Sequence, residues 1–317
     1  MSRVVVVGSF NLDHAWTTAT LPRPGETLCG RYASGPGGKG FNQAVAAARS
    51  GAGTTFVCAL GDDPAAAVAR DLARRDGIAL RADVRAVPTG TAGIFVASGG
   101  TNSIVVAAGA NGELGAAFVA AQAEAFAGAG VVLAQLEVPL DAVREALRRG
   151  RDAGAPTVLN PAPADVALPP DLLALCDVVT PNETEFAALL QRHLGVQVDP
   201  GDVAATDDAM LHAWCRELLP TGTVVVTLGA AGCFASVPAD PGQPTLRLPA
   251  ARVAPVDTTG AGDAFSGALA ASLALDRQAP LQRHVAYASR YAGVSTETPG
   301  AAAAMPRRSE VAERFPA

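Results

Sequence analysis

A glycine-rich turn followed by a carboxylate lies late in the chain, in the segment Asp257-Thr258-Thr259-Gly260-Ala261-Gly262-Asp263-Ala264-Phe265-Ser266-Gly267. It follows a short extended stretch and opens an apolar stretch of helical period. The first N–H groups of a helix have no backbone partner and lie at the positive end of the helix dipole, so Gly260, Ala261 and Gly262 predict an anion site. Asp263 has two interpretations. It could merely start the helix, or it could be a general base that takes a proton from a hydroxyl attacking a phosphoryl group in that site.

An earlier glycine-rich segment, Gly35-Pro36-Gly37-Gly38-Lys39-Gly40, has the form G-x-G-x-x-G, and Asp62 follows at roughly the 20-residue spacing of a ribose-binding acid. This pattern is typical of a nicotinamide-dependent oxidoreductase, in which the glycines follow the first strand directly. Here the first predicted strand ends at Gly8 and a non-periodic, proline-containing stretch intervenes, so the context disfavours this alternative. A P-loop is also disfavoured, because Gly40 stands where Ser or Thr is required.

Short β-branched runs alternate along the chain with segments of helical period that could position these residues. The predicted strands are Arg3–Gly8, Thr54–Leu60, Val131–Gln135, Thr157–Asn160, Asp177–Thr180 and Thr223–Leu228. The predicted helices are Gly40–Arg49, Pro64–Asp76, Leu140–Ala153, Glu183–Leu194, Asp207–Leu218, Ala261–Leu275 and Leu281–Val294. Valine runs indicate strands buried on both faces, and the alternation predicts a doubly wound, mainly parallel sheet in a Rossmann-like three-layer α/β/α fold.

Two regions break this alternation and predict a small separate β-sheet. Residues 11–35 show no helical period, and residues 91–107 fit two short strands, Thr91–Ala97 and Ser103–Ala107, around Gly99-Gly100-Thr101-Asn102. No internal repeat or long linker divides the chain. We therefore expect one domain over residues 1–317, with a lid formed by residues 11–35 and 91–110.

Composition excludes several classes of protein. The 317 residues carry a formal net charge of −6, and 49% of them are hydrophobic, which rules out a disordered chain. An acidic chain without runs of Lys and Arg lacks the surface of a nucleic-acid binder. The five cysteines have no C-x-x-C spacing and the four histidines form no ligand-spaced pair, which disfavours a disulfide framework or a zinc site. No apolar stretch approaches the ~18 residues of a membrane span, so we expect a cytoplasmic protein with no nucleic-acid or membrane partner.

An ordered series of motifs extends over nearly the whole chain. It consists of Gly8-Ser9-Phe10-Asn11-Leu12-Asp13, Gly37-Gly38-Lys39-Gly40-Phe41-Asn42-Gln43-Ala44, Gln135-Leu136-Glu137-Val138-Pro139, Leu159-Asn160-Pro161-Ala162-Pro163-Ala164, Pro181-Asn182-Glu183-Thr184-Glu185, Thr227-Leu228-Gly229-Ala230-Ala231-Gly232, and the segment Asp257 to Gly267. In order and spacing the series resembles the ribokinase family, the PfkB-type carbohydrate kinases. The resemblance implies a ribokinase-like fold with a small β-sheet lid.

The resemblance also implies roles for individual residues. The family's sugar-binding positions match Asn11, Asp13, Gly38, Lys39, Asn42 and Glu137. Short amides and carboxylates at such positions can each hold two hydroxyls of a sugar. The family's catalytic base matches Asp263, which would also touch the substrate, and its anion hole matches Gly260, Ala261 and Gly262. Its ATP-binding positions match Asn182, Thr227, Gly229 and Gly232.

Two metal sites are implied in the same way. Asn182 and Glu185 match the family's magnesium-and-phosphate motif, which acts through water, as suits an ion that keeps several waters. A monovalent-cation site, usually for potassium, would use Asp257, Thr259, Ser295, Thr298 and Gly300. Ala304 stands where the family often has an oxygen-bearing serine.

Purely structural interpretations stand beside these roles. Glu137 fits an ion pair with Arg144 near a helix start. Asn182 and Glu185, three positions apart, fit a helix capping box. Both alternatives concern contacts that the tertiary structure can test directly.

The resemblance implies ATP-dependent phosphorylation of D-ribose at its 5-hydroxyl, with Mg²⁺ and with K⁺ as activator. The Asn11-x-Asp13 pair and the Gly-Gly-Lys-Gly-x-Asn-Gln string favour ribose. Aromatic residues make up only 5% of the chain, with Trp16 the one evident lid candidate, which disfavours a nucleoside kinase. An adenosine, inosine or other sugar kinase of the family remains the alternative, and an NAD(P)-dependent oxidoreductase or a non-catalytic sugar-binding regulator is more remote. Unpaired lid edges, and the family, imply a homodimer formed through the lid.

Overall fold

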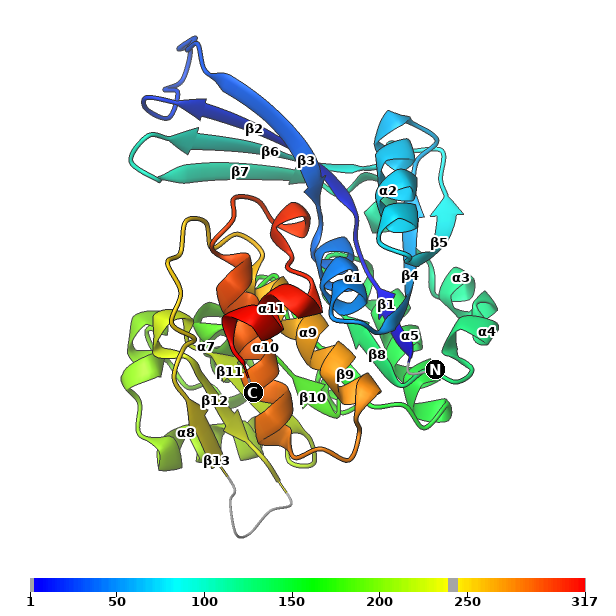
Figure 1. Cartoon of the computed structure of the whole chain (residues 1–317), viewed down its shortest axis with the longest axis vertical. Helices are drawn as coiled ribbons and strands as arrows, with labels where there is room; N and C mark the ends of the chain where they lie inside the picture. Colours follow the sequence, from blue (N-terminus) through cyan, green and yellow to red (C-terminus); the bar gives the residue numbers. More distant parts are fainter. Residues whose placement is uncertain (1–2, 239–244, 317) are drawn as a thin grey trace.

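The computed structural model describes residues 3–238 and 245–316. Within these ranges a nine-stranded sheet has the order β13-β12-β11-β10-β9-β8-β1-β4-β5 (Figure 1). Its strands are β1 (Arg3–Val7), β4 (Gly53–Leu60), β5 (Ala79–Val84), β8 (Val131–Ala134), β9 (Thr157–Leu159), β10 (Val178–Val179), β11 (Thr223–Thr227), β12 (Cys233–Ser236) and β13 (Thr245–Leu248). The strands from β11 to β5 are parallel, and β12 and β13 add an antiparallel edge.

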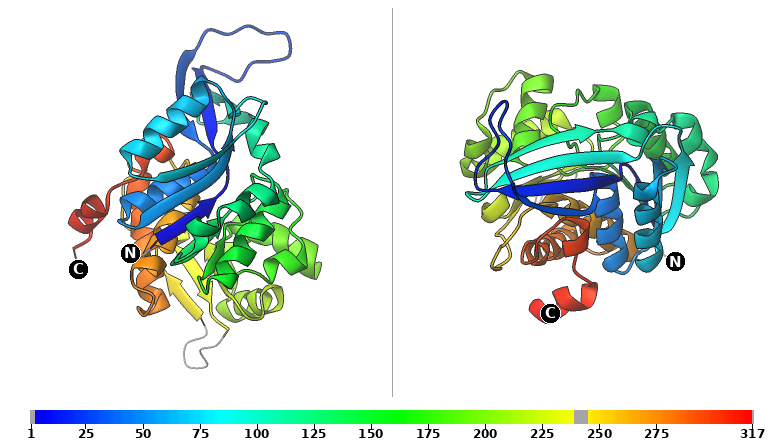
Figure 2. Two further views of the ribbon diagram at one scale, coloured as in Figure 1. Left: turned by 90° about the vertical axis from the view of Figure 1, so that its right-hand side faces the viewer. Right: turned by 90° about the horizontal axis from the view of Figure 1, so that it is seen from above.

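Helices cover both faces of this sheet (Figure 1, Figure 2). One face packs against α1 (Lys39–Arg49), α2 (Pro64–Arg75), α9 (Ala261–Leu275), α10 (Leu281–Ser295) and α11 (Arg308–Arg314). The other face packs against α3 (Ala116–Ala121), α4 (Ala123–Phe126), α5 (Leu140–Asp152), α6 (Pro170–Leu173), α7 (Glu183–Leu194) and α8 (Asp208–Leu218). Val4 and Val6 of β1 enter the first core, and Val5 and Val7 enter the second, because strand side chains alternate between faces. The predicted three-layer α/β/α fold is confirmed.

The predicted helices and main-sheet strands are present, and their ends differ from the expectations by one residue at most. The sequence pattern does not predict β5, β12 or β13. In β5, Ala79, Ala82 and Asp83 have low strand propensity, and the strand is held by its pairing with β4 at one edge of the sheet. The extended conformation of these strands at the edges of the sheet therefore depends on pairing with their neighbours.

The order of the strands reverses at β1. The chain pairs β4 with one side of β1, adds β5, and then returns to pair β8 with the other side. In open α/β sheets, ligands bind beyond the carboxyl ends of the strands at such a reversal. A site is therefore expected around the residues that follow β1 and β8, which begin at Gly8 and Gln135.

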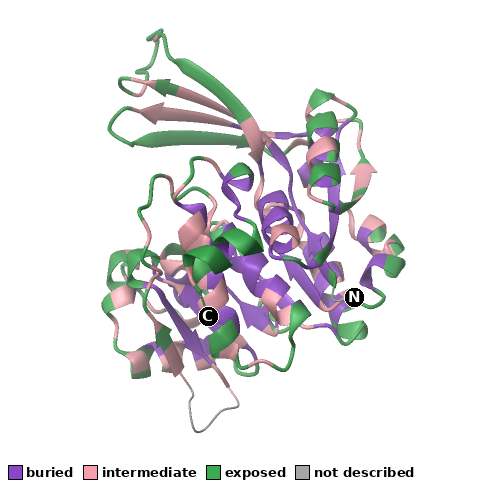
Figure 3. Ribbon diagram, viewed as in Figure 1, coloured by how far each residue is buried: buried purple, intermediate pink, exposed green. Residues whose placement is uncertain are grey.

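A second, four-stranded sheet stands off the main domain, with the order β3-β2-β6-β7 (Figure 1). Its strands are β2 (Asn11–Thr18), β3 (Arg31–Gly37), β6 (Gly90–Ala97) and β7 (Asn102–Ala107). β2 is parallel to β6, and the pairs β2–β3 and β6–β7 are antiparallel. The outer strand β7 is exposed along its whole length (Figure 3). The predicted small separate sheet is thus present. None of the helices in the described ranges is long and apolar enough to cross a membrane.

Candidate active site

The segments that follow β1 and β8 meet the start of α1. Ser9 Oγ donates to Glu137 Oε2 over 2.6 Å, and the Lys39 backbone N–H donates to the same oxygen over 3.0 Å. Gly40 lets the helix approach this closely, because a Cβ at residue 40 would lie 2.5 Å from Ser9 N. Gly38 immediately precedes the helix with a φ of 85°, in the region that favours glycine. The reversal point of the sheet therefore holds a carboxylate, Glu137, at the N-terminus of α1.

Glu137 does not form the ion pair that the structural interpretation predicts. Arg144 Nη1 lies 2.6 Å from Asp171 Oδ2 instead. Glu137 is bound by Ser9 and Lys39, both of which belong to the crevice. The expectation of a Glu137–Arg144 pair is wrong, and Glu137 faces the candidate site.

Asp263 lies in the first turn of α9 and is only 5% exposed. Asn42 Nδ2 donates to its Oδ2 over 2.9 Å, and Gln43 Nε2 donates to its Oδ1 over 3.0 Å. Burial raises the pKa of Asp263, whereas Lys39 and the two amide donors lower it, with the balance above the ordinary value. A carboxylate held in this way is a candidate general base.

The turn before Asp263 forms an anion cradle at the N-terminus of the 15-residue helix α9. Gly260 has a φ of 74° and precedes the helix in the left-handed conformation. Ala261 N–H donates to Thr258 O over 3.2 Å, whereas no described residue accepts from the backbone N–H of Gly262 or Asp263. A Cβ at residue 262 would meet nothing within 4 Å, so the space beside these donors is open. Among the described residues, the N–H groups of Gly262 and Asp263 are thus free to bind an anion, whereas that of Ala261, a predicted member of the anion hole, is engaged.

Lys39 carries the positive charge of the site. Burial lowers its pKa, but Asp263, Glu137 and Glu185 raise it, and the balance lies above the ordinary value. Lys39 is therefore protonated at neutral pH, among carboxylates contributed by α9, by the segment after β8 and by α7. It can neutralise part of the charge of an anionic substrate.

Asp13 and Asn11 reach the site from β2. Asp13 lies against Gly37, where a Cβ would come within 2.1 Å of Asp13 Oδ2, and burial, followed by the charge of Glu137, raises the pKa of Asp13 to about 6. Asn11 Oδ1 accepts from Asn111 Nδ2 over 2.8 Å. Asn111 also binds the backbone N–H and carbonyl of Phe10. Sequence reasoning missed Asn111, and only the pairing of segments about 100 residues apart reveals it.

Asn182 and Glu185 form the predicted capping box at the start of α7. Asn182 Oδ1 accepts from Glu185 N over 2.8 Å, and Glu185 Oε2 accepts from Asn182 N over 2.9 Å. Glu185 is 7% exposed, and its burial raises its pKa. The charge of Lys39 lowers the pKa of Glu185 and that of Asp263 raises it, so this capping carboxylate lies within electrostatic reach of the site.

Thr227, Gly229 and Gly232 form a tight turn beside this helix start. Thr227 ends β11 and bridges to Asn182. Gly229 and Gly232 have φ values of 49° and 95°, and a Cβ at residue 232 would lie 2.0 Å from Leu248 O. The structure thus brings the four predicted ATP-binding residues together at the ends of two neighbouring strands.

The predicted potassium ligands are only partly gathered. Asp257 Oδ1 accepts from the N–H and hydroxyl of Thr259, and Asp257 Oδ2 accepts from Gly300 N over 2.8 Å. Ser295 Oγ donates within its own helix, to Ala292 O, and Thr298 is exposed. Asp257 therefore ties the segment of Thr259 to the segment of Gly300, and these three of the five predicted ligands lie together. In the described ranges, no hydrogen bond joins the side chain of Ser295 or Thr298 to these three residues.

A magnesium ion would find few protein ligands. In the described ranges no group of three His, Cys, Asp or Glu side chains could hold a metal ion. Glu185 offers one buried carboxylate near the anion cradle. One such ligand fits an ion that is held mainly by water and by substrate phosphates.

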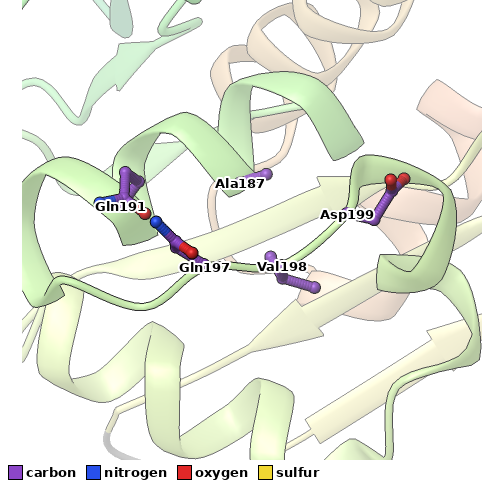
Figure 4. Close-up of a pocket in the computed structure, with 5 residues that line it drawn as sticks. All are labelled: Ala187, Gln191, Gln197, Val198 and Asp199. Atoms are coloured by element: carbon purple, nitrogen blue, oxygen red, sulfur yellow. The ribbon is translucent and has the colours of Figure 1, made fainter.

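The hollow in Figure 4 is not part of this site. It has a volume of about 510 Å³ and is lined by Ala187, Gln191, Gln197, Val198 and Asp199. Its one carboxylate, Asp199, accepts from Gly201 N. The residues that line this hollow therefore do not form a candidate catalytic site.

The fold and the site together define a phosphotransferase that acts on a hydroxyl: an open α/β sheet whose reversal point faces a buried carboxylate and an anion cradle. The chain belongs to the pfkB family of carbohydrate kinases, whose family model matches residues 1–308. This confirms the family resemblance, and the oxidoreductase alternative is not supported. The glycine segment on which that alternative depends, residues 35–40, joins β3 of the second sheet to α1 and does not follow β1.

Relatives and solved structures agree with this assignment. The chain is 36% identical over 313 residues to the ribokinase of Haemophilus influenzae, covering 98% of this chain and 97% of that protein. It is 37% identical to the bifunctional ribokinase/ribose-5-phosphate isomerase A of Fructilactobacillus sanfranciscensis, with 98% of this chain and 56% of that longer protein covered. The structure of Arabidopsis thaliana ribokinase complexed with ribose and ATP superposes with a TM-score of 0.83 at 29% identity, over 100% of this chain and 99% of that one.

Proposed function

We propose that this protein transfers the terminal phosphoryl group of ATP to the 5-hydroxyl of D-ribose. The observation that carries the proposal is the position of Asp263, a buried carboxylate in the same helical turn as the free N–H groups of the anion cradle. The relatives described as ribokinases, and the Arabidopsis protein complexed with ribose and ATP, support the sugar and the co-substrate.

In the proposed mechanism, Asp263 orients the primary hydroxyl and accepts its proton as the hydroxyl attacks the phosphoryl group in line. The backbone N–H groups of Gly262 and Asp263, with Gly260 and Ala261 shaping the turn, stabilise the charge that develops on the phosphoryl oxygens. Lys39 adds a positive charge between the base and Glu137. Positioning and charge stabilisation thus account for most of the catalysis, as is general for phosphoryl transfer.

The sugar is bound between the second sheet and α1. Asn11 and Asp13 approach from β2, and Gly38, Lys39, Asn42 and Glu137 line the opposite side. Asn111 donates to the side-chain oxygen of Asn11 and so fixes the direction of that amide. The side-chain N–H groups of Asn11 are then directed to the ligand. These carboxylates and amides suit a polyol with several hydroxyls.

The nucleotide would lie along Asn182, Thr227, Gly229 and Gly232. Glu185 and Asn182 would hold a magnesium ion through water, and that ion would supply positive charge to neutralise the phosphates of ATP. A potassium ion would lie at the loop of Asp257, Thr259 and Gly300, with the backbone near Ser295 and Thr298. That loop adjoins the anion cradle, because Gly260 approaches Ala301.

The second sheet is proposed to act as a lid that excludes water from the transferred phosphoryl group, which limits hydrolysis of ATP. Its outer strand exposes Ile104, Val105 and Val106 by 53%, 68% and 56%. An exposed apolar edge strand of this kind invites pairing, so we propose a homodimer formed through the lids. A cytoplasmic location suits a kinase that uses ATP.

A nucleoside kinase is the second candidate, favoured by one observation. Trp16 stacks on Phe95 with ring centroids 5.4 Å apart and lies 5.3 Å from the ring of Tyr32. These aromatic rings of the second sheet provide a surface on which a base could stack.

An ADP-release assay with ribose, deoxyribose, fructose, adenosine and inosine, with and without potassium, tests these alternatives. Turnover with ribose well above the others supports the proposal. Preferential turnover with a nucleoside would keep the role of Asp263 and overturn the sugar. Sugar binding without ADP release would favour the non-catalytic regulator.

A further inference from the structure

We propose that Gln43 is a positioning residue for the catalytic base: Gln135 and Asn160 hold its side chain so that its N–H group donates to Asp263. This inference deepens the proposed phosphoryl transfer and rests on it. It concerns three buried amides that the mechanism above does not use.

Every polar atom of the Gln43 side chain is engaged. Nε2 donates to Asp263 Oδ1 over 3.0 Å and to Asn160 Oδ1 over 3.1 Å, and Oε1 accepts from Gln135 Nε2 over 2.8 Å. Gln43 and Gln135 are 0% exposed and Asn160 is 4% exposed. The four side chains come from α1, the end of β8, the end of β9 and α9, so the contacts join four separate parts of the chain.

The backbone sets the direction of these hydrogen bonds. Asn160 Nδ2 donates to the carbonyl oxygen of Thr180 over 3.0 Å, and a carbonyl can only accept. Asn160 must therefore present its oxygen to Gln43, and Gln43 must present its nitrogen to both Asn160 and Asp263. A reversed amide at residue 43 would place its oxygen against two acceptors. The carbonyl group of Thr180, which follows β10, thus sets the direction of the Asn160 amide. Asn160 in turn sets the direction of the Gln43 amide, so Asp263 Oδ1 receives an N–H.

This arrangement favours the ionised form of Asp263, which is the form a base requires. Hydrogen bonds donated to a carboxylate lower its pKa and oppose the effect of burial. Three charged groups also face Asp263: Lys39 on α1, Glu137 after β8 and Glu185 on α7. A variant that removes only the amide donor leaves these charges in place, so its effect on the pKa can be isolated.

Gln135 supports a role beyond packing. Its Oε1 is buried and, among the described residues, has no hydrogen-bond partner. It also lies where a Cβ on Gly8 would come within 1.9 Å. An apolar side chain of similar shape would avoid this unsatisfied acceptor, but it would leave the buried Gln43 Oε1 without its donor. What the amide supplies is the N–H that holds Gln43.

The test is the pH dependence of kcat in Gln43→Met and Gln135→Met, with ATP and ribose saturating. Methionine keeps the approximate shape of glutamine and removes the donor. For Gln43→Met we expect kcat to fall about 10-fold, with KM values within about twofold, because the base is misplaced rather than the sugar. The acid limb should move to higher pH by about one unit, since a lost donor raises the pKa of the base. Gln135→Met should shift the limb in the same direction by less.

Thr157→Val is the matched control. The Thr157 hydroxyl is buried at the opposite end of β9 from Asn160 and donates to Leu175 O over 2.6 Å. This variant should unfold at lower temperature with the acid limb unchanged. An unshifted limb in both glutamine variants, or an equal shift in Thr157→Val, would overturn the inference. If Gln43→Met does not fold, Gln135→Met decides alone, because it leaves Gln43 in place. A wild-type protein inactive on ribose would instead refute the proposed function.

Discussion

Asn42 Nδ2 lies 2.9 Å from Asp263 Oδ2, although 221 residues separate the two along the chain. The contact joins the first turn of α1 to the first turn of α9, two helices that share one core. A residue expected to touch the sugar therefore also holds the expected base. The expected substrate and catalytic residues therefore lie together, where the N-termini of α1 and α9 meet.

Asp263→Asn should lose turnover by at least ~10²-fold, the scale of a lost general base. Asparagine keeps the shape of the side chain but cannot accept the proton. Ribose and ATP should still bind, as measured by titration calorimetry alongside ADP release. Turnover near that of the wild type would remove Asp263 from the role of base.

The apparent KM for ribose should rise as the pH falls through about 6. Burial and Glu137 raise the pKa of Asp13 to about 6, so Asp13 becomes protonated there and ceases to accept from two sugar hydroxyls. Above that pH the ionised form should bind ribose well. In Asp13→Asn the KM should be higher and nearly independent of pH over this range. An Asp13→Asn profile that retains the wild-type step would assign the titration to another group.

Gly40→Ala should lower the stability of the fold, whereas Gly262→Ala should keep the stability and lower the activity. A Cβ at residue 40 would lie 2.5 Å from the backbone N of Ser9, so this variant should lose about 1–3 kcal/mol of unfolding free energy. A Cβ at residue 262 meets nothing within 4 Å, so Gly262→Ala should keep its stability. Its methyl group would occupy the anion cradle, however, and kcat should fall at least about 10-fold. Chemical denaturation and ADP release measure the two effects, and equal stability losses would contradict the assignment of open space.

Val105→Glu should convert the proposed dimer to monomers. Val105 is 68% exposed on the outer strand of the second sheet, and a charge there would be buried in a lid-to-lid contact. Sedimentation velocity of wild type and variant gives the oligomeric state. The matched control is Val84→Glu, which changes a 55% exposed valine on the edge strand of the main sheet. A dimer that persists in Val105→Glu would place the interface elsewhere.

Potassium should increase turnover of the wild type more than sodium does, and Asp257→Ala should abolish the difference. Asp257 ties together the N–H of Thr259 and the N–H of Gly300, so its removal loosens the loop beside the anion cradle. ADP release at constant ionic strength measures the response. An unchanged potassium response in Asp257→Ala would move the cation to another site.

Much of the fold was predictable because its signals are local. The valine runs of β1 and β11 and the helical period of α7 and α9 identify the layers of the main domain. Residues 11–35 were assigned to the small sheet without strand bounds. β2 pairs with β3 within this region and with β6, which lies about 80 residues further along the chain. The pairing with β6 depends on contacts that no local window contains.

The candidate site likewise has features that follow from the local sequence and features that depend on tertiary contacts. The sequence by itself determined the glycine turn, Asp263 within it and the capping pattern of Asn182 and Glu185, because helix starts follow short-range rules of backbone donors and acceptors. Only the tertiary structure decided that Asn111 holds Asn11, that Arg144 turns to Asp171, and that Gln43 donates to Asp263. Those bonds form between segments that are separated along the sequence and become neighbours only in the folded chain. The direction of a buried amide is set by whichever donor or acceptor the fold places opposite it.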